Sequence, residues 1–216
     1  MKAAIFDVDN TITTRDTFFI FFRYIIAKKP IRIFQIFHIF YGLIKTRIFG
    51  ADRILVKKNV IKLLKNDTEE SIRETCQVFV RQELKKFISE KAKIAIQNHK
   101  NDGYKIILIS ASPEIYINLI GEYLAVDYSL GTRCEFKNNE ITIIGKHCYG
   151  AEKCQRLSEF LAEEKLELDY KNSYFYSDHH SDLPLLLEVG NPVAVNASTK
   201  LNDICKKYNW PNLNWR

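Results

Sequence analysis

The sequence lacks any long apolar run. Its longest stretch without a charged residue, 33–44, has twelve residues, about 18 Å as a helix, whereas the apolar core of a bilayer is about 30 Å thick. Low-complexity segments and internal repeats are also missing, and 46% of the residues are hydrophobic. These features exclude a membrane-spanning helix and a disordered chain, and they predict a compact globular protein.

Cysteine is sparse and follows no pattern. The five cysteines are scattered, and none belongs to a Cys-x-x-Cys pair. An odd and unpatterned set is typical of a reduced protein, so we expect a cytoplasmic location. We expect no secretory signal either, because an apolar strand begins almost at Met1 and leaves no room for one.

The most informative feature of the sequence is an apolar strand that ends in two carboxylates. Residues 3–6 read as a strand buried on both faces, and Asp7, Asp9 and Thr11 follow in the turn. In an open α/β sheet, ligands bind at the carboxyl ends of the strands. Two aspartates at such an end predict a Mg²⁺ site, because Mg²⁺ prefers oxygen ligands.

Further strands are predicted along the chain, two of them ending in a residue that can carry chemistry. Residues 105–109 form an apolar run before Ser110, residues 174–177 precede Asp178, and residues 193–195 form a last strand. Helical patterns lie between these runs. Strands that alternate with helices predict an α/β fold with a mostly parallel sheet.

Local signals place three further elements. Pro113 suits the first turn of the helix that follows Ser110. Residues 133–144 are expected to form a small hairpin, and a helix that begins near Gly150 carries Lys153 in its first turn. These elements bring a lysine near the predicted carboxylates.

Each of these residues alone has an ordinary structural explanation. Asp and Asn are common in turns, Ser is common before helices, and a single Lys is usually solvated. The set is more informative than its members, because independent cap residues need not assemble metal ligands, a cation and an anion-binding turn at one sheet edge. The set consists of Asp7, Asp9, Ser110, Lys153, Asp178 and Asp182.

The order and spacing of these residues resemble the haloacid dehalogenase superfamily of phosphatases, and more closely its subfamily IB, which includes phosphoserine phosphatases. The resemblance runs along the whole chain and rests on four motifs, which are Asp7-x-Asp9-x-Thr11, residues 109–114, residues 150–153 and residues 177–186. It implies a Rossmann-like parallel core with an inserted helical cap of the C1 type. We accordingly expect a core of residues 1–14 and 101–216 and a cap of residues 15–100.

The resemblance also implies a role for each matched residue. Asp7 would be the nucleophile that forms an aspartyl-phosphate, and Asp9 would act first as acid and then as base. Mg²⁺ would be held by Asp7, by the backbone carbonyl of Asp9 and by Asp178. The remaining roles are phosphoryl binding by Ser110 and Ala111, charge compensation and phosphate binding by Lys153, orientation of Lys153 by Asp182, and support of the first turn by Thr11.

The substrate is less well determined by the motifs. A phosphorylated metabolite or a phospholipid head group fits the resemblance, and phosphoserine is one alternative. The sequence departs from the phosphoserine branch, because Ala111 and Ser112 replace two glycines and Asp16 stands where glutamate is usual. Asp16 is therefore either a substrate contact at the cap or the N-cap of a helix that begins at Thr17.

A basic segment follows the first motif. Residues 17–65 contain eleven Lys and Arg against one acid, Asp52, whereas the rest of the chain is mildly acidic. Its first helices mix these cations with many aromatic residues, an arrangement that suits a bilayer interface and resembles the cap of bacterial phosphatidylglycerophosphate phosphatases. Peripheral contact with an anionic membrane, the interior of a helical cap and a dimer interface remain alternatives here. A membrane-surface binding protein with an incidental phosphatase core is the alternative function.

A nucleic-acid partner is not expected. The basic residues alternate with large aliphatic side chains rather than with exposed aromatics and glycines. His179 and His180 follow the predicted metal aspartate, but imidazole suits softer metals than Mg²⁺, so we expect them beside the ligands or facing substrate. His147 and Cys148 are expected to pack against the core.

Overall fold

The computed structural model describes residues 1–28, 57–58, 60–64, 67–137 and 140–216. Most of the basic and aromatic segment lies outside the described residues, as does the centre of the predicted hairpin turn. In the part of the chain that is described, no helix is long and apolar enough to cross a membrane.

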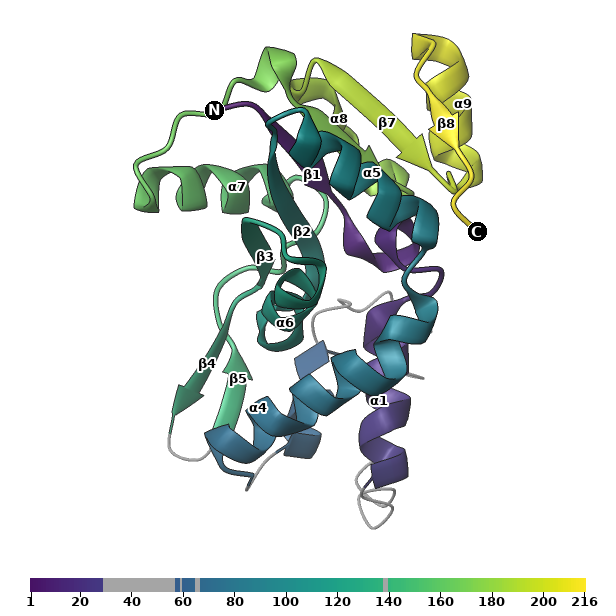
Figure 1. Ribbon diagram of the computed structural model, residues 1–216. Helices are drawn as coiled ribbons and strands as arrows, with labels where there is room; N and C mark the ends of the chain where they lie inside the picture. The colour runs from purple at the N-terminus through teal and green to yellow at the C-terminus, as the bar shows by residue number, and fades with distance from the viewer. Residues whose placement is uncertain (29–56, 59, 65–66, 138–139) are drawn as a thin grey trace, which may run out of the picture.

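A six-stranded sheet forms the centre of the molecule (Figure 1). Its order is β3-β2-β1-β6-β7-β8, and every neighbouring pair is parallel. The predicted parallel α/β architecture is therefore confirmed. The strands are β1 (Ala3–Phe6), β2 (Lys105–Pro113), β3 (Tyr128–Thr132), β6 (Tyr174–Ser177), β7 (Asn191–Val195) and β8 (Asn212–Leu213).

Helices cover both faces of the sheet. Alternate residues of β1 point to opposite sides, so Ala4 and Phe6 join one apolar cluster and Ala3 and Ile5 join another. The first cluster includes side chains of α5 (Glu90–Asn101) and α6 (Glu114–Leu124). The second includes side chains of α7 (Glu152–Glu163), α8 (Leu183–Glu188) and α9 (Thr199–Tyr208). All four residues of β1 are fully buried as a result.

Two helices lie beyond the carboxyl ends of β1 and β2 (Figure 1). They are α1 (Thr17–Lys28) and α4 (Glu69–Val78). The rings of Phe21, Phe79 and Tyr116 meet between them and α6, with centroids 4.8 to 5.7 Å apart. This aromatic cluster fixes α1 over the end of the sheet.

The division into core and cap remains a prediction. Helix α5 falls within the range assigned to the cap, but its Ala92 and Ile96 pack in the cluster on the sheet face. The predicted hairpin is present as antiparallel strands β4 (Cys134–Lys137) and β5 (Glu140–Ile143).

Strand β2 is longer than the sequence predicts. It continues past Ser110 to Pro113, which precedes α6 instead of lying in its first turn. The pairing with β3 shifts register between Ile109 and Pro113, and Pro113 pairs with Thr132. This irregularity curls residues 110–112 around the end of the sheet and brings them to the site described below.

Candidate active site

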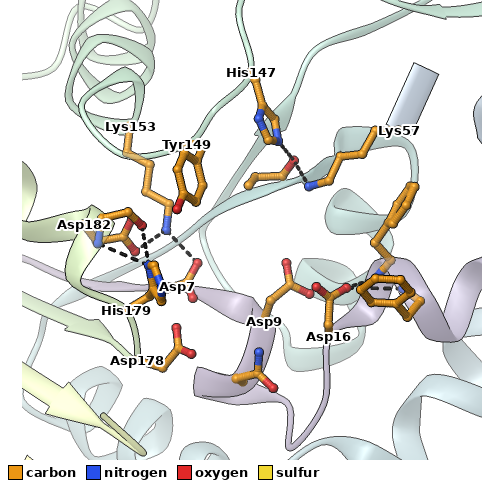
Figure 2. A pocket seen from close by; sticks show the side chains of 15 residues that line it. Asp7, Asp9, Asp16, Lys57, His147, Tyr149, Lys153, Asp178, His179 and Asp182 are labelled. Atoms are coloured by element: carbon orange, nitrogen blue, oxygen red, sulfur yellow. Dashed lines mark hydrogen bonds and ion pairs between the residues drawn. The ribbon is translucent and has the colours of Figure 1, made fainter. Parts of the chain in front are cut away.

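A cavity of about 420 Å³ opens at the carboxyl ends of β1, β2 and β6 (Figure 2). Of the predicted site residues, seven line it, and Thr11 and Ser110 lie directly behind them. The seven are Asp7, Asp9, Asp16, Ala111, Lys153, Asp178 and Asp182. The fold thus brings the nine predicted site residues together at one end of the sheet.

The first motif forms a tight turn directly after β1. Asn10 has a left-handed backbone with a φ of 60°, a conformation that Asn tolerates better than most residues. Within this turn, the Thr11 hydroxyl donates a hydrogen bond to Asp7 Oδ2 at 3.2 Å. Asp7 lines the cavity but is only 5% exposed, so its carboxylate is almost fully shielded from solvent.

Lys153 forms the floor of the site between two aspartates. Its Nζ lies 2.6 Å from Asp7 Oδ1 and 2.6 Å from Asp182 Oδ2, and the residue is 2% exposed. The Ser177 hydroxyl donates to the same oxygen of Asp182 at 2.8 Å. Burial disfavours the charge of Lys153, but Asp182 and Asp7 together outweigh it and raise the pKa of Lys153 above its ordinary value. The lysine is therefore charged at every physiological pH.

Negative charge exceeds positive charge around the cavity. Five aspartates and two lysines line it. Burial raises the pKa of Asp7 to about 7, opposed by Lys153 and helped by Asp182 and Asp9. Burial and the neighbouring charge of Asp7 raise the pKa of Asp178 to about 8. Burial and like charges thus both disfavour ionisation of these carboxylates, and an added cation would oppose both effects.

The donor set fits a hard divalent cation. Among the described residues, no three His, Cys, Asp or Glu side chains group as a metal cluster. Asp7 and Asp178 nevertheless supply two carboxylates to the cavity that Asp9 also lines. Mg²⁺ usually takes one or two carboxylates and keeps several waters, so this sparse set suits Mg²⁺ better than a softer metal.

Four hydrogen bonds hold the carboxylate of Asp9. Thr17 donates to Oδ1 from its backbone N–H at 2.7 Å and from its hydroxyl at 2.5 Å. Ser110 and Ser112 donate to Oδ2 at 3.1 and 2.9 Å. Each oxygen therefore accepts two bonds, which is the full capacity of a carboxylate.

The peptide carbonyl of Ala111 collects three donors. Lys57 Nζ lies 2.7 Å from this oxygen, the Thr132 hydroxyl 2.7 Å, and His147 Nε2 3.1 Å. Figure 2 shows Lys57 and His147 converging on it from opposite sides. These contacts fix the Ser110–Ser112 turn from both the region of α1 and the hairpin side of the sheet.

Asp16 is the predicted N-cap, and its contact with substrate remains a prediction. Its Oδ1 accepts hydrogen bonds from the N–H groups of Phe18 and Phe19 at 2.9 and 3.2 Å, so it is the N-cap of α1. The same carboxylate lines the cavity (Figure 2). Burial and the nearby charge of Asp9 raise its pKa to about 6. Asp16 therefore carries its charge at neutral pH and loses it in mild acid.

The lining residues that the sequence did not identify as part of the site include Lys57, His147 and Tyr149. The rings of His147 and Tyr149 stack with centroids 5.7 Å apart, and the ring centroids of Tyr149 and His179 are 6.4 Å apart. This aromatic wall overturns the expectation that His147 only packs against the core. The predicted helix start near residue 152 could have indicated His147 and Tyr149, because residues that precede a helix at the end of a sheet often face the site. No comparable sequence signal indicated Lys57.

A protein-family model for haloacid dehalogenase-like hydrolases matches residues 4–187. A histidinol-phosphatase of Neisseria meningitidis serogroup C is 29% identical, over 99% of this chain and 98% of the relative. A phosphoserine phosphatase of Mycobacterium tuberculosis is 23% identical, over 96% of this chain and 69% of its own length.

Solved structures show the same fold. A Bordetella pertussis protein of unknown function superposes with a TM-score of 0.86 at 21% identity, covering 100% of this chain and 99% of that one. A substrate-bound phosphoserine phosphatase superposes with a TM-score of 0.64 at 19% identity, covering 100% and 93%.

Proposed function

The chain belongs to the haloacid dehalogenase-like hydrolases and is a phosphatase, and from this premise we propose that it hydrolyses phosphate monoesters of small amino alcohols through an aspartyl-phosphate. The observation that carries the proposal is the buried triad in which Lys153 bonds both Asp7 and Asp182 at the end of the sheet. A charged lysine held against a cavity-facing carboxylate can neutralise a phosphoryl group that reacts with that carboxylate.

In the first step, a carboxylate oxygen of Asp7 attacks phosphorus. A P–O bond forms to Asp7, the bond to the alcohol oxygen breaks, and Asp9 gives that oxygen a proton. Lys153 and Thr11 fix the two oxygens of Asp7 for this attack. Because positioning and charge neutralisation dominate phosphoryl transfer, these fixed contacts favour the reaction.

In the second step, water hydrolyses the aspartyl-phosphate. Asp9, now ionised, takes a proton from the water as it attacks phosphorus, and the bond between phosphorus and Asp7 breaks. Inorganic phosphate leaves and Asp7 is a carboxylate again. Ser110 and the N–H of Ala111 are proposed to bind phosphoryl oxygens during both steps.

Mg²⁺ is the proposed cofactor. The carboxylates of Asp7 and Asp178 and the backbone carbonyl of Asp9 would hold it. When bound, it supplies positive charge that reduces the repulsion between the anionic substrate and the aspartates.

The substrate class follows from the walls of the cavity and from the relatives. Histidinol phosphate and phosphoserine, which the names of two relatives specify, are both phosphates of primary alcohols with a neighbouring amine. Asp16 offers a carboxylate to such an amine. The rings of Phe18, His147 and Tyr149 suit the flat imidazole of histidinol phosphate better than the carboxylate of phosphoserine, which favours histidinol phosphate.

An Asp16→Asn variant tests the amine contact. Asn caps helices as well as Asp does, so the variant keeps α1 and removes only the charge. We expect KM for histidinol phosphate to rise about tenfold at pH 8 with an unchanged kcat. Because the pKa of Asp16 is raised to about 6, wild type loses this charge in mild acid, and the difference in KM should shrink below pH 6.

Glycerol 2-phosphate, which has no amine, is the control substrate for this variant. Its KM should be the same for wild type and Asp16→Asn. An equal rise for both substrates would assign Asp16 to the helix cap alone.

A substrate comparison tests the class itself. We expect kcat/KM to be highest for histidinol phosphate, lower for phosphoserine and lowest for phosphatidylglycerophosphate in detergent. If kcat/KM for the lipid is at least tenfold higher than for the amino-alcohol phosphates, the substrate class is a phospholipid head group and not an amino alcohol.

Contact with an anionic membrane remains a prediction from the basic segment, because most of that segment lies outside the described residues. We expect vesicles with anionic phosphatidylglycerol to carry the protein upward in a flotation gradient at low salt and to release it at high salt. Neutral phosphatidylcholine vesicles are the control. Absence of flotation at low salt would contradict membrane contact and the alternative of a membrane-surface binding protein.

A further inference from the structure

The bonds around Asp9 contain a residue with no assigned role, Ser112. Its hydroxyl donates to Asp9 Oδ2 at 2.9 Å and lies 3.2 Å from the Thr17 hydroxyl on the other side of the carboxylate. Tyr116 closes the group with its hydroxyl 3.5 Å from Thr17 Oγ1. Ser112 thus joins the end of β2 to the start of α1 at the residue proposed to move protons.

Ser112 cannot contact a substrate from this position. It is 0% exposed and does not line the cavity, whereas its neighbour Ala111 does. Whatever its hydroxyl contributes to the reaction must therefore act through its two partners, Asp9 and Thr17, and Thr17 itself donates to Asp9.

The two serines on Asp9 Oδ2 have different surroundings. Ser110 Oγ also accepts the N–H of Ser112 at 3.0 Å, and its proposed partner during the reaction is a phosphoryl oxygen. When Ser110 donates to the phosphoryl group, it releases Asp9 Oδ2. That release opens a site on Oδ2 for the proton that passes to or from the alcohol oxygen, and only Ser112 then still holds this oxygen.

We infer that Ser112 is a positioning residue that keeps Asp9 directed at the leaving oxygen while Ser110 binds the phosphoryl group. This inference rests on the proposed function, because it needs Asp9 to be the proton donor. It assigns Ser112 a role in selecting substrates with poor leaving groups, since these depend on protonation of the leaving oxygen.

The consequence is a dependence on the leaving group. An alkyl alkoxide is a strong base and must be protonated as the P–O bond breaks, whereas p-nitrophenolate leaves without a proton. Misplacement of Asp9 should therefore slow the first step for alkyl phosphates and spare it for an aryl phosphate. General loss of structure would slow both.

The experiment compares wild type with Ser112→Ala and Ser112→Cys. The substrates are p-nitrophenyl phosphate and three alkyl phosphates, namely histidinol phosphate, phosphoserine and glycerol 2-phosphate. The readout is kcat/KM, which reports formation of the aspartyl-phosphate. We expect both variants to lose about tenfold on each alkyl phosphate that wild type hydrolyses, and less than twofold on p-nitrophenyl phosphate.

The cysteine variant separates hydrogen bonding from packing. A thiol fills nearly the same space as a hydroxyl but is a weak donor. Wild-type behaviour of Ser112→Cys, with a loss in Ser112→Ala alone, would show that Ser112 only fills space and would overturn the inference.

Ser173→Ala is the matched control. Ser173 is also 0% exposed, and its hydroxyl makes two hydrogen bonds, to the Asp169 carbonyl at 2.6 Å and from the Ala3 N–H at 3.0 Å, at the opposite end of the sheet. We expect this variant to unfold at a lower temperature and to keep the wild-type ratio between alkyl and aryl substrates.

Two results distinguish failure of the inference from failure of the proposed function. An equal loss on alkyl and aryl phosphates in the Ser112 variants would overturn the inference and leave the phosphatase assignment intact. Wild type that hydrolyses p-nitrophenyl phosphate but none of the alkyl phosphates would overturn the proposed substrate class, and the role of Ser112 with it.

Discussion

Replacement of Asp7 by asparagine should lower kcat by at least about 10⁴-fold on every phosphate monoester that the wild-type protein hydrolyses. The amide has the size of the carboxylate but cannot attack phosphorus and form the acyl phosphate. Asp7 contacts Lys153 and Thr11, and asparagine retains a carbonyl oxygen for one of these donors. We therefore expect the variant to fold, with Lys153 still paired to Asp182.

Two measurements test this prediction. Turnover of p-nitrophenyl phosphate reports activity, and circular dichroism with thermal unfolding reports the fold. Asp203→Asn is the matched control, because it removes the same charge from a side chain on α9 that is 69% exposed and does not line the cavity. Turnover by Asp7→Asn within tenfold of wild type would exclude Asp7 as the nucleophile.

Removal of divalent metal should abolish turnover almost as completely. The cavity presents five aspartates and two lysines to a substrate that is itself an anion, so without an added cation the substrate is repelled. We expect EDTA to inactivate the protein and excess Mg²⁺ to restore it. EDTA that is saturated with Mg²⁺ beforehand is the control and should have no effect; full activity in free EDTA would rule out the proposed cofactor.

The Mg²⁺ requirement should also depend on pH. Raised pKa values of about 7 for Asp7 and about 8 for Asp178 mean that the metal-free site holds protons at pH 6 and has released them by pH 9. Mg²⁺ must displace these protons, so the concentration that restores half of the activity should fall as the pH rises. A concentration independent of pH would show that these two aspartates do not bind the metal.

The sheet could be predicted because its signals are local. Strands β1, β6 and β7 are short apolar runs that end at turn residues, and the first turn of α7 with Lys153 follows Gly150. The parallel order follows from alternation with helices. The same local signals placed the predicted site residues of the four motifs in or directly behind one cavity.

The remaining features depend on contacts between distant segments. Strand β3 contains Gly131 and only one fully buried aliphatic residue, so its own sequence does not predict a strand. Gly131 is needed there because a Cβ would lie 2.7 Å from the backbone of Glu114. Lys57 and His147 come from distant segments and meet at the cavity, where each donates a hydrogen bond to the carbonyl of Ala111. No local sequence pattern predicts contacts between segments so far apart in the chain.

The strand order also determines when the site can exist during synthesis. Strand β1, which leads to Asp7 and Asp9, is translated before both of its neighbours. Its Ala4 pairs with Ile106 of β2 on one side and with Tyr174 of β6 on the other. On the ribosome, β1 can therefore pair with β2 only after about half of the chain has been made, and its other edge stays unpaired until β6 is translated. Its apolar residues are exposed in that interval, and the nascent chain is a candidate client for chaperones until β6 emerges.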